Sequence, residues 1–173
     1  MKRWSLAPAD LLAGCDALGP WTAWVQPGGM TPPGMVAAPS SAGRSEVAGH
    51  QRMLEDVVLR IDRWLVDPRT VPAELPAGPP FHRACWVAAC SIAPGATVTY
   101  ATLAAMAGRP AAARAAAQAM ARNRLAPLVP CHRVVSSSGL GGFMGEGASA
   151  GDGAWALRLK RWLLAREGAS VAQ

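Results

Sequence analysis

The sequence predicts a fold of the α+β class in two parts, residues 1–74 and residues 75–173, of which the second is mainly helical. Three observations carry this prediction. Apolar residues recur at helical spacing from Met53 to Leu65. The segment "PRTVPAELPAGPP" that follows contains five prolines and favours an extended connector. Beyond it, two short helical segments flank a glycine-containing turn, which predicts a helix-turn-helix.

Residues 1–74 contain one clear element. The stretch "QPGGMTPPGMVAAPSSAG" over residues 26–43 is rich in Gly, Pro and Ser, which predicts a loop or disorder. A helix with a core-facing side runs from Met53 to Leu65, and Asp67-Pro68 predicts its end. The start "MKRWSLAPADLLAG" is too short and too interrupted for a signal peptide, and no apolar run approaches the roughly 20 residues of a membrane span. We therefore expect no membrane association and a cytoplasmic location.

The second part begins with a helix predicted over Phe81–Ser91 and a turn at Pro94-Gly95. The stretch "TVTY" then predicts a strand-like or capped start for the next helix. Thr97 or Thr99 is its expected N-cap, because a threonine hydroxyl can accept a hydrogen bond from a free backbone N–H of the first turn.

The next two helices form the predicted helix-turn-helix. The first ends at Gly108, and the second has Pro110 in its first turn, is rich in alanine and stops near Asn123. An ordinary helical hairpin is the alternative. A helix of methyl groups could approach a DNA groove closely, but only a few of its side chains could contact base edges, so such a helix would bind with little sequence preference.

The four cysteines, Cys15, Cys85, Cys90 and Cys131, have no spacing typical of a disulfide framework, and we expect free thiols. Cys85 and Cys90 lie in "FHRACWVAACSI", where a helical face predicts core positions. One histidine, His82, precedes them, but this set lacks a fourth zinc ligand, so we expect no metal there.

The net charge of +6 is unevenly distributed. From Leu75 to Gly145 the chain contains no Asp or Glu, and the arginines in that stretch are Arg83, Arg109, Arg114, Arg122, Arg124 and Arg133. Such a run can simply be a solvated surface. It is also typical of a surface that binds a polyanion, because each phosphate contact gains free energy by releasing counterions. Nucleic acid is therefore the leading expected partner.

The stretch "PLVPCHRVV" places Cys131 directly before His132. A buried cysteine is usually an inert small hydrophobe, and this is the simpler interpretation. Pro130 fixes the backbone just before the thiol, and the surroundings carry no acid, which favours a functional cysteine. A free thiol with a pKa near ~8.5 is only slightly ionised at neutral pH, so a nucleophilic Cys131 needs a neighbour that takes its proton.

From about Phe81 to Gly168 the chain resembles the O6-alkylguanine-DNA alkyltransferases, also called methylated-DNA-protein-cysteine methyltransferases. The resemblance rests on "TYATLAAMAGRPAAARAAAQAMARN", on "PCHRVV" and on the later "RWLLAREG". It implies that residues 1–74 form a small, degenerate α/β part and that residues 75–173 form a helical DNA-binding domain with the cysteine loop. It implies one transfer per molecule, without cofactor, from O6-alkylguanine, and less efficiently O4-alkylthymine, in double-stranded DNA to a monomeric protein.

The resemblance also assigns the reacting residues. Cys131 matches the nucleophile, which attacks the alkyl carbon of a nucleotide flipped out of the duplex. His132 matches the histidine that takes the thiol proton through a water, and Glu167 matches the carboxylate that orients the imidazole. Pro130 and Arg133 belong to the same motif, where the arginine has a structural role in the cysteine loop.

Further positions match base-binding residues of the family. Tyr100 corresponds to a tyrosine that crowds the phosphate and hydrogen-bonds the base, and Arg114 to the arginine that fills the vacated stack. Asn123 corresponds to the hinge before the cysteine loop. The main-chain carbonyl groups of Cys131 and Val134 correspond to acceptors for the exocyclic amine of guanine.

The sequence departs from the family pattern after the motif. The segment "SSSGLGGFMGEG" is one residue short, with Phe143 in place of a tyrosine and Glu146 in place of a glycine, and "GASAGDGAWA" lengthens the connection to the last helix. A backbone N–H near Met144 would face the guanine oxygen. The zinc ligands of some members have no match. These changes affect residues expected to line the base pocket, and so the range of alkyl groups that fit.

Two other functions are compatible with parts of the sequence. A non-catalytic lesion sensor or DNA-binding module on the same scaffold would lack the cysteine, whereas Cys131, His132 and Glu167 are all present. A cysteine hydrolase would need an oxyanion hole and a route for turnover, and a basic helix-turn-helix would serve no purpose in it.

Overall fold

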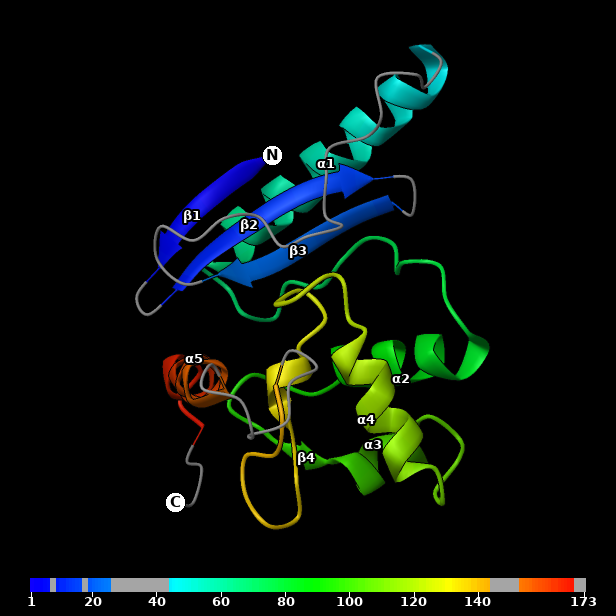
Figure 1. The fold of residues 1–173 in the computed structure, drawn as a ribbon, viewed down its shortest axis with the longest axis vertical. Coiled ribbons are helices and arrows are strands. Elements are labelled where there is room, and N and C mark those ends of the chain that lie inside the picture. Colours follow the sequence, from blue (N-terminus) through cyan, green and yellow to red (C-terminus); the bar gives the residue numbers. More distant parts are fainter. Residues whose placement is uncertain (7–8, 17–18, 26–43, 144–152, 170–173) are drawn as a thin grey trace. The chain divides into compact units, whose positions relative to one another are not determined.

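The computed structural model describes residues 1–6, 9–16, 19–25, 44–143 and 153–169. The chain forms two compact units (Figure 1). One consists of Met1–Ala77 together with Arg124–Leu128, and the other of Gly78–Asn123 together with Val129–Gln173. The predicted loop over residues 26–43 lies outside the described residues. The α+β class is confirmed.

The first unit contains an antiparallel sheet in the order β1-β2-β3, formed by β1 (Lys2–Leu6), β2 (Ala9–Asp16) and β3 (Gly19–Val25). The sequence analysis expected a small α/β part here, which this sheet confirms, but it located none of the strands. Leu11 and Leu12 explain the failure, because they point to opposite faces of β2 and both are fully buried. A strand buried on both faces shows no alternation of apolar and polar residues.

Helix α1 (Arg44–Trp64) lies along one face of this sheet (Figure 1). It begins well before the predicted segment, and its core-facing residues Val57, Ile61 and Trp64 are buried at helical spacing, as predicted. Trp4 on β1 donates its indole N–H to the Asp62 carboxylate on α1 over 2.7 Å. The turn after the helix contains Asp67, whose carboxylate accepts a hydrogen bond from the backbone N–H of Arg69.

The second unit opens with α2 (Pro80–Cys90), which agrees with the predicted helix to within a residue. After it come β4 (Val98–Thr99) and α3 (Tyr100–Met106). The Thr99 hydroxyl accepts a hydrogen bond from the Thr102 backbone N–H over 3.1 Å, so Thr99, and not Thr97, is the N-cap of the two that the sequence predicts.

Helix α4 (Ala113–Ala121) begins later than predicted. Pro110 is not in its first turn but in the connection from α3, where the Ala112 N–H donates to the Arg109 carbonyl group over 2.9 Å. The short η1 helix (Cys131–Arg133), strand β5 (Val134–Val135) and α5 (Gly153–Arg166) complete the unit. Strands β4 and β5 pair in parallel, Val98 with Val134.

Alanine side chains let α2 and α4 pack closely. Ala116 and Ala119 of α4 are fully buried, and the Trp86 indole N–H of α2 donates to the Ala119 carbonyl group over 2.9 Å. Cys85 is buried as predicted, whereas Cys90 is only half-buried. Arg114 and Gln118 are exposed on the other side of α4. Within the described residues, every helix is too short or too polar to cross a membrane.

Candidate active site

Cys131 lies at the start of η1, between the buried segment Val129–Pro130 and strand β5. Its backbone N–H donates to the Val129 carbonyl group over 2.8 Å, and the Arg133 N–H donates to the Pro130 carbonyl group over 3.0 Å. The parallel pairing of β5 with β4 then fixes the chain beyond the motif. Cys131 as a whole is only 8% exposed, so the thiol belongs to a buried segment that these contacts hold in place rather than to a loose loop.

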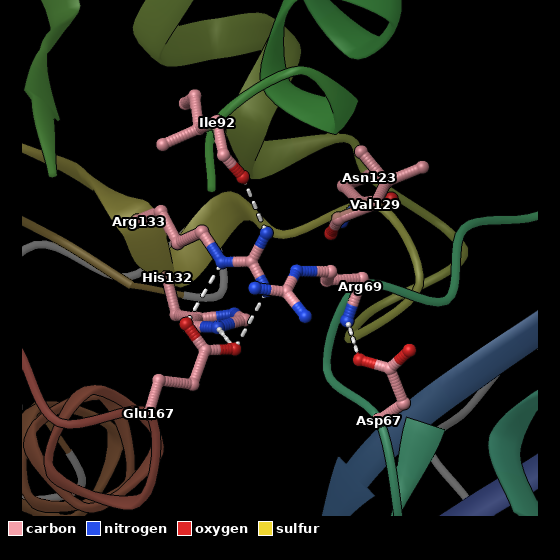
Figure 2. A network of polar contacts seen from close by, with 8 residues as sticks. All are labelled: Asp67, Arg69, Ile92, Asn123, Val129, His132, Arg133 and Glu167. Carbon is pink, nitrogen blue, oxygen red and sulfur yellow. Dashed lines mark hydrogen bonds and ion pairs between the residues drawn. The ribbon is translucent and has the colours of Figure 1, made fainter. Parts of the chain in front are cut away.

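Glu167 joins the two residues that follow Cys131 (Figure 2). Its Oε1 atom lies 2.9 Å from His132 Nε2 and accepts a hydrogen bond from Arg133 Nη2 over 2.8 Å. Its Oε2 atom accepts from Arg133 Nε over 2.8 Å. The three side chains are at most 2% exposed. One carboxylate therefore holds both the imidazole and the guanidinium of the motif.

Arg133 also connects this network to the end of α2. Its Nη1 atom donates to the Ile92 carbonyl group over 2.6 Å (Figure 2). Gly95, in the following turn, approaches the main chain of Glu167 so closely that a Cβ atom on Gly95 would lie 2.9 Å from the Glu167 carbonyl oxygen. The turn between α2 and β4 thus fits against the end of α5.

The charge on Glu167 determines the tautomer of His132. Burial alone raises the pKa of Glu167, but the hydrogen bonds from His132 and Arg133 and the charges of both outweigh burial and lower this pKa to about 2. An ionised carboxylate only accepts hydrogen bonds, so His132 Nε2 carries the proton. The other ring nitrogen, Nδ1, is buried and has no hydrogen-bond partner among the described residues. Nδ1 is therefore the nitrogen free to accept a proton.

Burial keeps Cys131 and His132 uncharged at rest. It raises the pKa of the Cys131 thiol, while the Asn123 side chain and the Lys160 ammonium act in the opposite direction. It also lowers the pKa of His132, which the nearby Glu167 only partly offsets. At neutral pH the resting pair is thus a thiol and a neutral imidazole, and a thiolate forms only when the proton leaves Cys131 for a base.

Two of the expected base-binding residues, Tyr100 and Asn123, lie near this site. The half-buried Tyr100 donates its hydroxyl group to the Gly142 carbonyl group over 3.3 Å. Burial, and then charge on Cys131, raise the pKa of Tyr100. The Asn123 amide donates to the Val129 carbonyl group over 2.8 Å and so closes the chain just before the cysteine.

The other residues that the resemblance assigns to base binding do not share one environment. Phe143 is 5% exposed, and Val134 is fully buried in β5. Arg114 is exposed on α4 and takes no part in the polar network that the described residues form around Glu167. Met144 lies outside the described residues.

The sequence analysis missed one residue of this site, Lys160. It is fully buried on α5, and its ammonium group donates to main-chain carbonyl groups of the segment that follows Cys131. Burial lowers the pKa of Lys160 to about 8, which charge on Cys131 would raise. A signal was present: Lys160 follows Ala156 and precedes Glu167 by helical spacings, so it occupies the buried face of the last helix.

The chain is similar in sequence to known proteins. The family model for the 6-O-methylguanine DNA methyltransferase DNA binding domain matches residues 80–169. The regulatory protein ada of Salmonella typhimurium is 38% identical over 133 residues, 75% of this chain and 33% of that protein. The methylated-DNA-protein-cysteine methyltransferase of Mus musculus is 47% identical over 79 residues, 46% of this chain and 34% of that protein. The chain spans between a third and half the length of these curated relatives.

Solved structures have the same fold. The crystal structure of Mycobacterium tuberculosis OGT in complex with DNA superposes with a TM-score of 0.57 and 24% identity, over 91% of this chain and 92% of that chain. The O6-methylguanine-DNA methyltransferase of Pyrococcus kodakaraensis gives a TM-score of 0.51 at 16% identity, over 96% and 97% of the two chains. The family model matches more than half of the 173 residues of this chain. The chain therefore belongs to the 6-O-methylguanine DNA methyltransferase family.

Proposed function

We propose that this protein repairs DNA by transferring an alkyl group, irreversibly, from O6-alkylguanine, and less efficiently from O4-alkylthymine, to Cys131. The observation that carries the proposal is the buried contact of Glu167 with His132, the residue that follows Cys131, because this contact leaves one ring nitrogen, Nδ1, able to take a proton. Relatives named methylated-DNA-protein-cysteine methyltransferase support the same chemistry.

In the proposed reaction the proton of the Cys131 thiol moves to Nδ1 of His132, through a water. The sulfur then forms a bond to the alkyl carbon while the bond from that carbon to O6 of guanine breaks. The departing guanine takes both electrons of the broken bond and also the proton that His132 took up, so the imidazole is neutral again and the site regains its starting charge. The Glu167 carboxylate stabilises the imidazolium while it exists. No cofactor enters this balance.

The partner in this proposal is double-stranded DNA that contains an alkylated base, bound by a monomer in the cytoplasm. Arg114 would fill the stack that the flipped nucleotide leaves, and Tyr100 would contact the base and its phosphate. The carbonyl groups of Cys131 and Val134 would accept hydrogen bonds from the guanine amine. Phe143, and a backbone N–H near Met144, would line the pocket beyond it.

The test supplies a duplex carrying radiolabelled O6-methylguanine in excess over the protein. Label should become bound to the protein, reach a plateau at about one methyl group per chain and map to the Cys131 peptide. Cys131→Ala should bind the duplex with unchanged affinity and accept no label, and Cys85→Ala, a buried thiol outside the site, is the matched control. Binding of the modified duplex without transfer would instead identify a lesion sensor. Label on Cys85 or Cys90 would contradict the proposal.

A further inference from the structure

The Lys160 ammonium group has three hydrogen-bond acceptors, all of them main-chain carbonyl oxygens. Nζ lies 2.7 Å from the oxygen of Val134, 2.7 Å from that of Leu140 and 3.2 Å from that of Gly142. An ammonium group has three N–H donors, so its capacity is used completely. These acceptors belong to one stretch of chain, which starts three residues after Cys131 and ends beside Phe143.

The residue type suits this geometry. The chain contains two lysines and fifteen arginines, and one of the two lysines occupies this buried position. An ammonium directs three donors from a single atom, whereas a guanidinium spreads five donors over a rigid plane. Three carbonyl groups that converge on one point therefore fit a lysine and not an arginine.

The charge of Lys160 has no carboxylate against it within the described residues. A fully buried cation is costly unless dipoles or an opposite charge compensate it. The three carbonyl dipoles provide that compensation, and they do so only while the segment keeps its shape. The cation and the shape of the segment thus depend on each other.

Two of the three carbonyl groups have a further connection to the site. The Gly142 oxygen also accepts the hydroxyl group of Tyr100, at 3.3 Å. The Val134 oxygen has two lone pairs, of which Lys160 uses one. In the proposed function the guanine amine approaches this same oxygen, whose position the contact with Lys160 fixes.

We propose that Lys160 is a positioning residue for alkyl transfer: its ammonium group gathers the carbonyl groups of Val134, Leu140 and Gly142 and so fixes the wall against which the alkylated base is held. The inference rests on the proposed function and adds to it the residue that sets the shape of the base pocket.

The first test measures single-turnover transfer from O6-methylguanine duplex at several DNA concentrations. Lys160→Met removes the charge and Lys160→Arg keeps it, but neither side chain can gather three carbonyl groups at one point. We expect the maximal rate to fall about 100-fold in both variants, as for a reacting group displaced by about 1 Å, with unchanged affinity for unmodified duplex. Lys2→Met, a change at the only other lysine, should leave the rate unchanged. A normal maximal rate in Lys160→Arg would overturn the inference.

The second test needs no variant at the site and no activity. In protein labelled with ¹⁵N and ¹³C, Lys160 should give a slowly exchanging ammonium signal with hydrogen-bond couplings to the carbonyl carbons of Val134, Leu140 and Gly142, while Lys2 should exchange rapidly. A rapidly exchanging Lys160 signal without these couplings would overturn the inference. If the wild-type protein shows the couplings but transfers no methyl group, the proposed function fails and the contact itself stands.

Discussion

Glu167 is the residue on which the reacting site depends most directly, because its two oxygens accept hydrogen bonds from both His132 and Arg133. A glutamine in its place has one acceptor oxygen and an NH₂ group that would face donors. The imidazole would then lose the group that fixes its tautomer, and the buried charge of Arg133 would lose the carboxylate that neutralises it.

We expect Glu167→Gln to slow single-turnover transfer by at least about 100-fold and to lower the free energy of unfolding by about 3 kcal/mol. Rates on methylated duplex and denaturant unfolding measure the two effects. Glu55→Gln, a change at an exposed glutamate on α1, is the control and should alter neither. A wild-type rate in Glu167→Gln would mean that another carboxylate serves His132.

The same residue gives the protein an acid-sensitive contribution to stability. The pKa of Glu167 is about 2 in the folded protein against 4.5 for the free group, so the unfolded chain takes up the proton first as pH falls. The stabilisation is complete above pH 4.5 and is lost progressively toward pH 2. The difference in stability between the wild type and Glu167→Gln should therefore shrink over this window.

At the level of single residues, the sequence predicts the reacting residues better than the residues that hold them in place. Cys131 and His132 are adjacent in the chain, so their proximity needs no fold, and a known family pattern points to Glu167. Lys160 was missed because lysines on helices are usually exposed, although its helical spacing from Ala156 and Glu167 was a signal for the buried face that the packing of α5 shows. The ion pair of Arg133 with Glu167 joins residues 34 positions apart and likewise depends on the fold.

Among the elements, the turn between α2 and β4 supports the end of α5. Gly95 has a φ angle of +80° and contacts the Glu167 carbonyl oxygen, whereas Gly108, after α3, has a φ of +81° and open space where a Cβ atom would lie. Both glycines adopt a left-handed conformation that other residues disfavour. Of the two, only Gly95 also lies close to a residue of the site, Glu167.

We expect Gly95→Ala and Gly108→Ala each to lower stability by about 1 kcal/mol because of the backbone strain. Gly95→Ala should also push the Glu167 main chain away and slow the reaction of Cys131 with a free O6-alkylguanine base, whereas Gly108→Ala should not. Melting curves and single-turnover rates separate the two effects. Equal rates in the two variants would show that the contact at Gly95 has no influence on the site.

Helix α4 carries the second prediction at this scale. If Arg114 replaces the flipped nucleotide in the stack, Arg114→Ala should slow transfer from duplex far more than transfer from a free O6-alkylguanine base, since flipping costs a few kcal/mol only when there is a stack to leave. Arg122→Ala, at the other end of α4 and also exposed, is the control. An equal loss of transfer rate on the two substrates would show that Arg114 supports the fold and does not fill the stack.

The helices of the second unit were predictable because each has a capping residue or an apolar face, as Thr99 shows for α3. The start of α4 was not predictable, because Pro110 is compatible both with a turn between helices and with the first turn of a helix. The hydrogen bond from the Ala112 N–H to the Arg109 carbonyl group shows that it lies in the turn between helices. Strands β4 and β5 have two residues each and pair Val98 with Val134. No local pattern specifies so distant a pairing.

At the scale of the whole molecule, the first unit includes a segment from the middle of the chain. Arg124–Leu128 belongs to it, and the Thr22 N–H on β3 donates to the Arg124 carbonyl group over 2.6 Å. Leu125 and Leu128 in this segment are fully buried. A discontinuous unit of this kind cannot be seen in composition or linkers, and the boundary near residue 75 stays a prediction.

A fragment of residues 75–173 tests that boundary. Without the sheet, Leu125 and Leu128 lose their cover, and exposing two leucines costs roughly 3–6 kcal/mol. We expect the fragment to melt at a lower temperature than the full chain and to bind a hydrophobic dye, and Leu125→Ser with Leu128→Ser should reduce that dye binding. A fragment as stable as the full chain, without dye binding, would show that the domain folds independently.

The scarcity of lysine has a practical consequence for attaching this protein to a surface. Lys160 is buried, whereas the side chain of Lys2 is 43% exposed where it meets Asp62. An amine-reactive ester that spares guanidinium groups would therefore find a single accessible lysine, on the first strand of the sheet. Molecules coupled at Lys2 would be attached through the first unit, and the arginines of the second unit would keep their charge for the DNA that the proposed function requires.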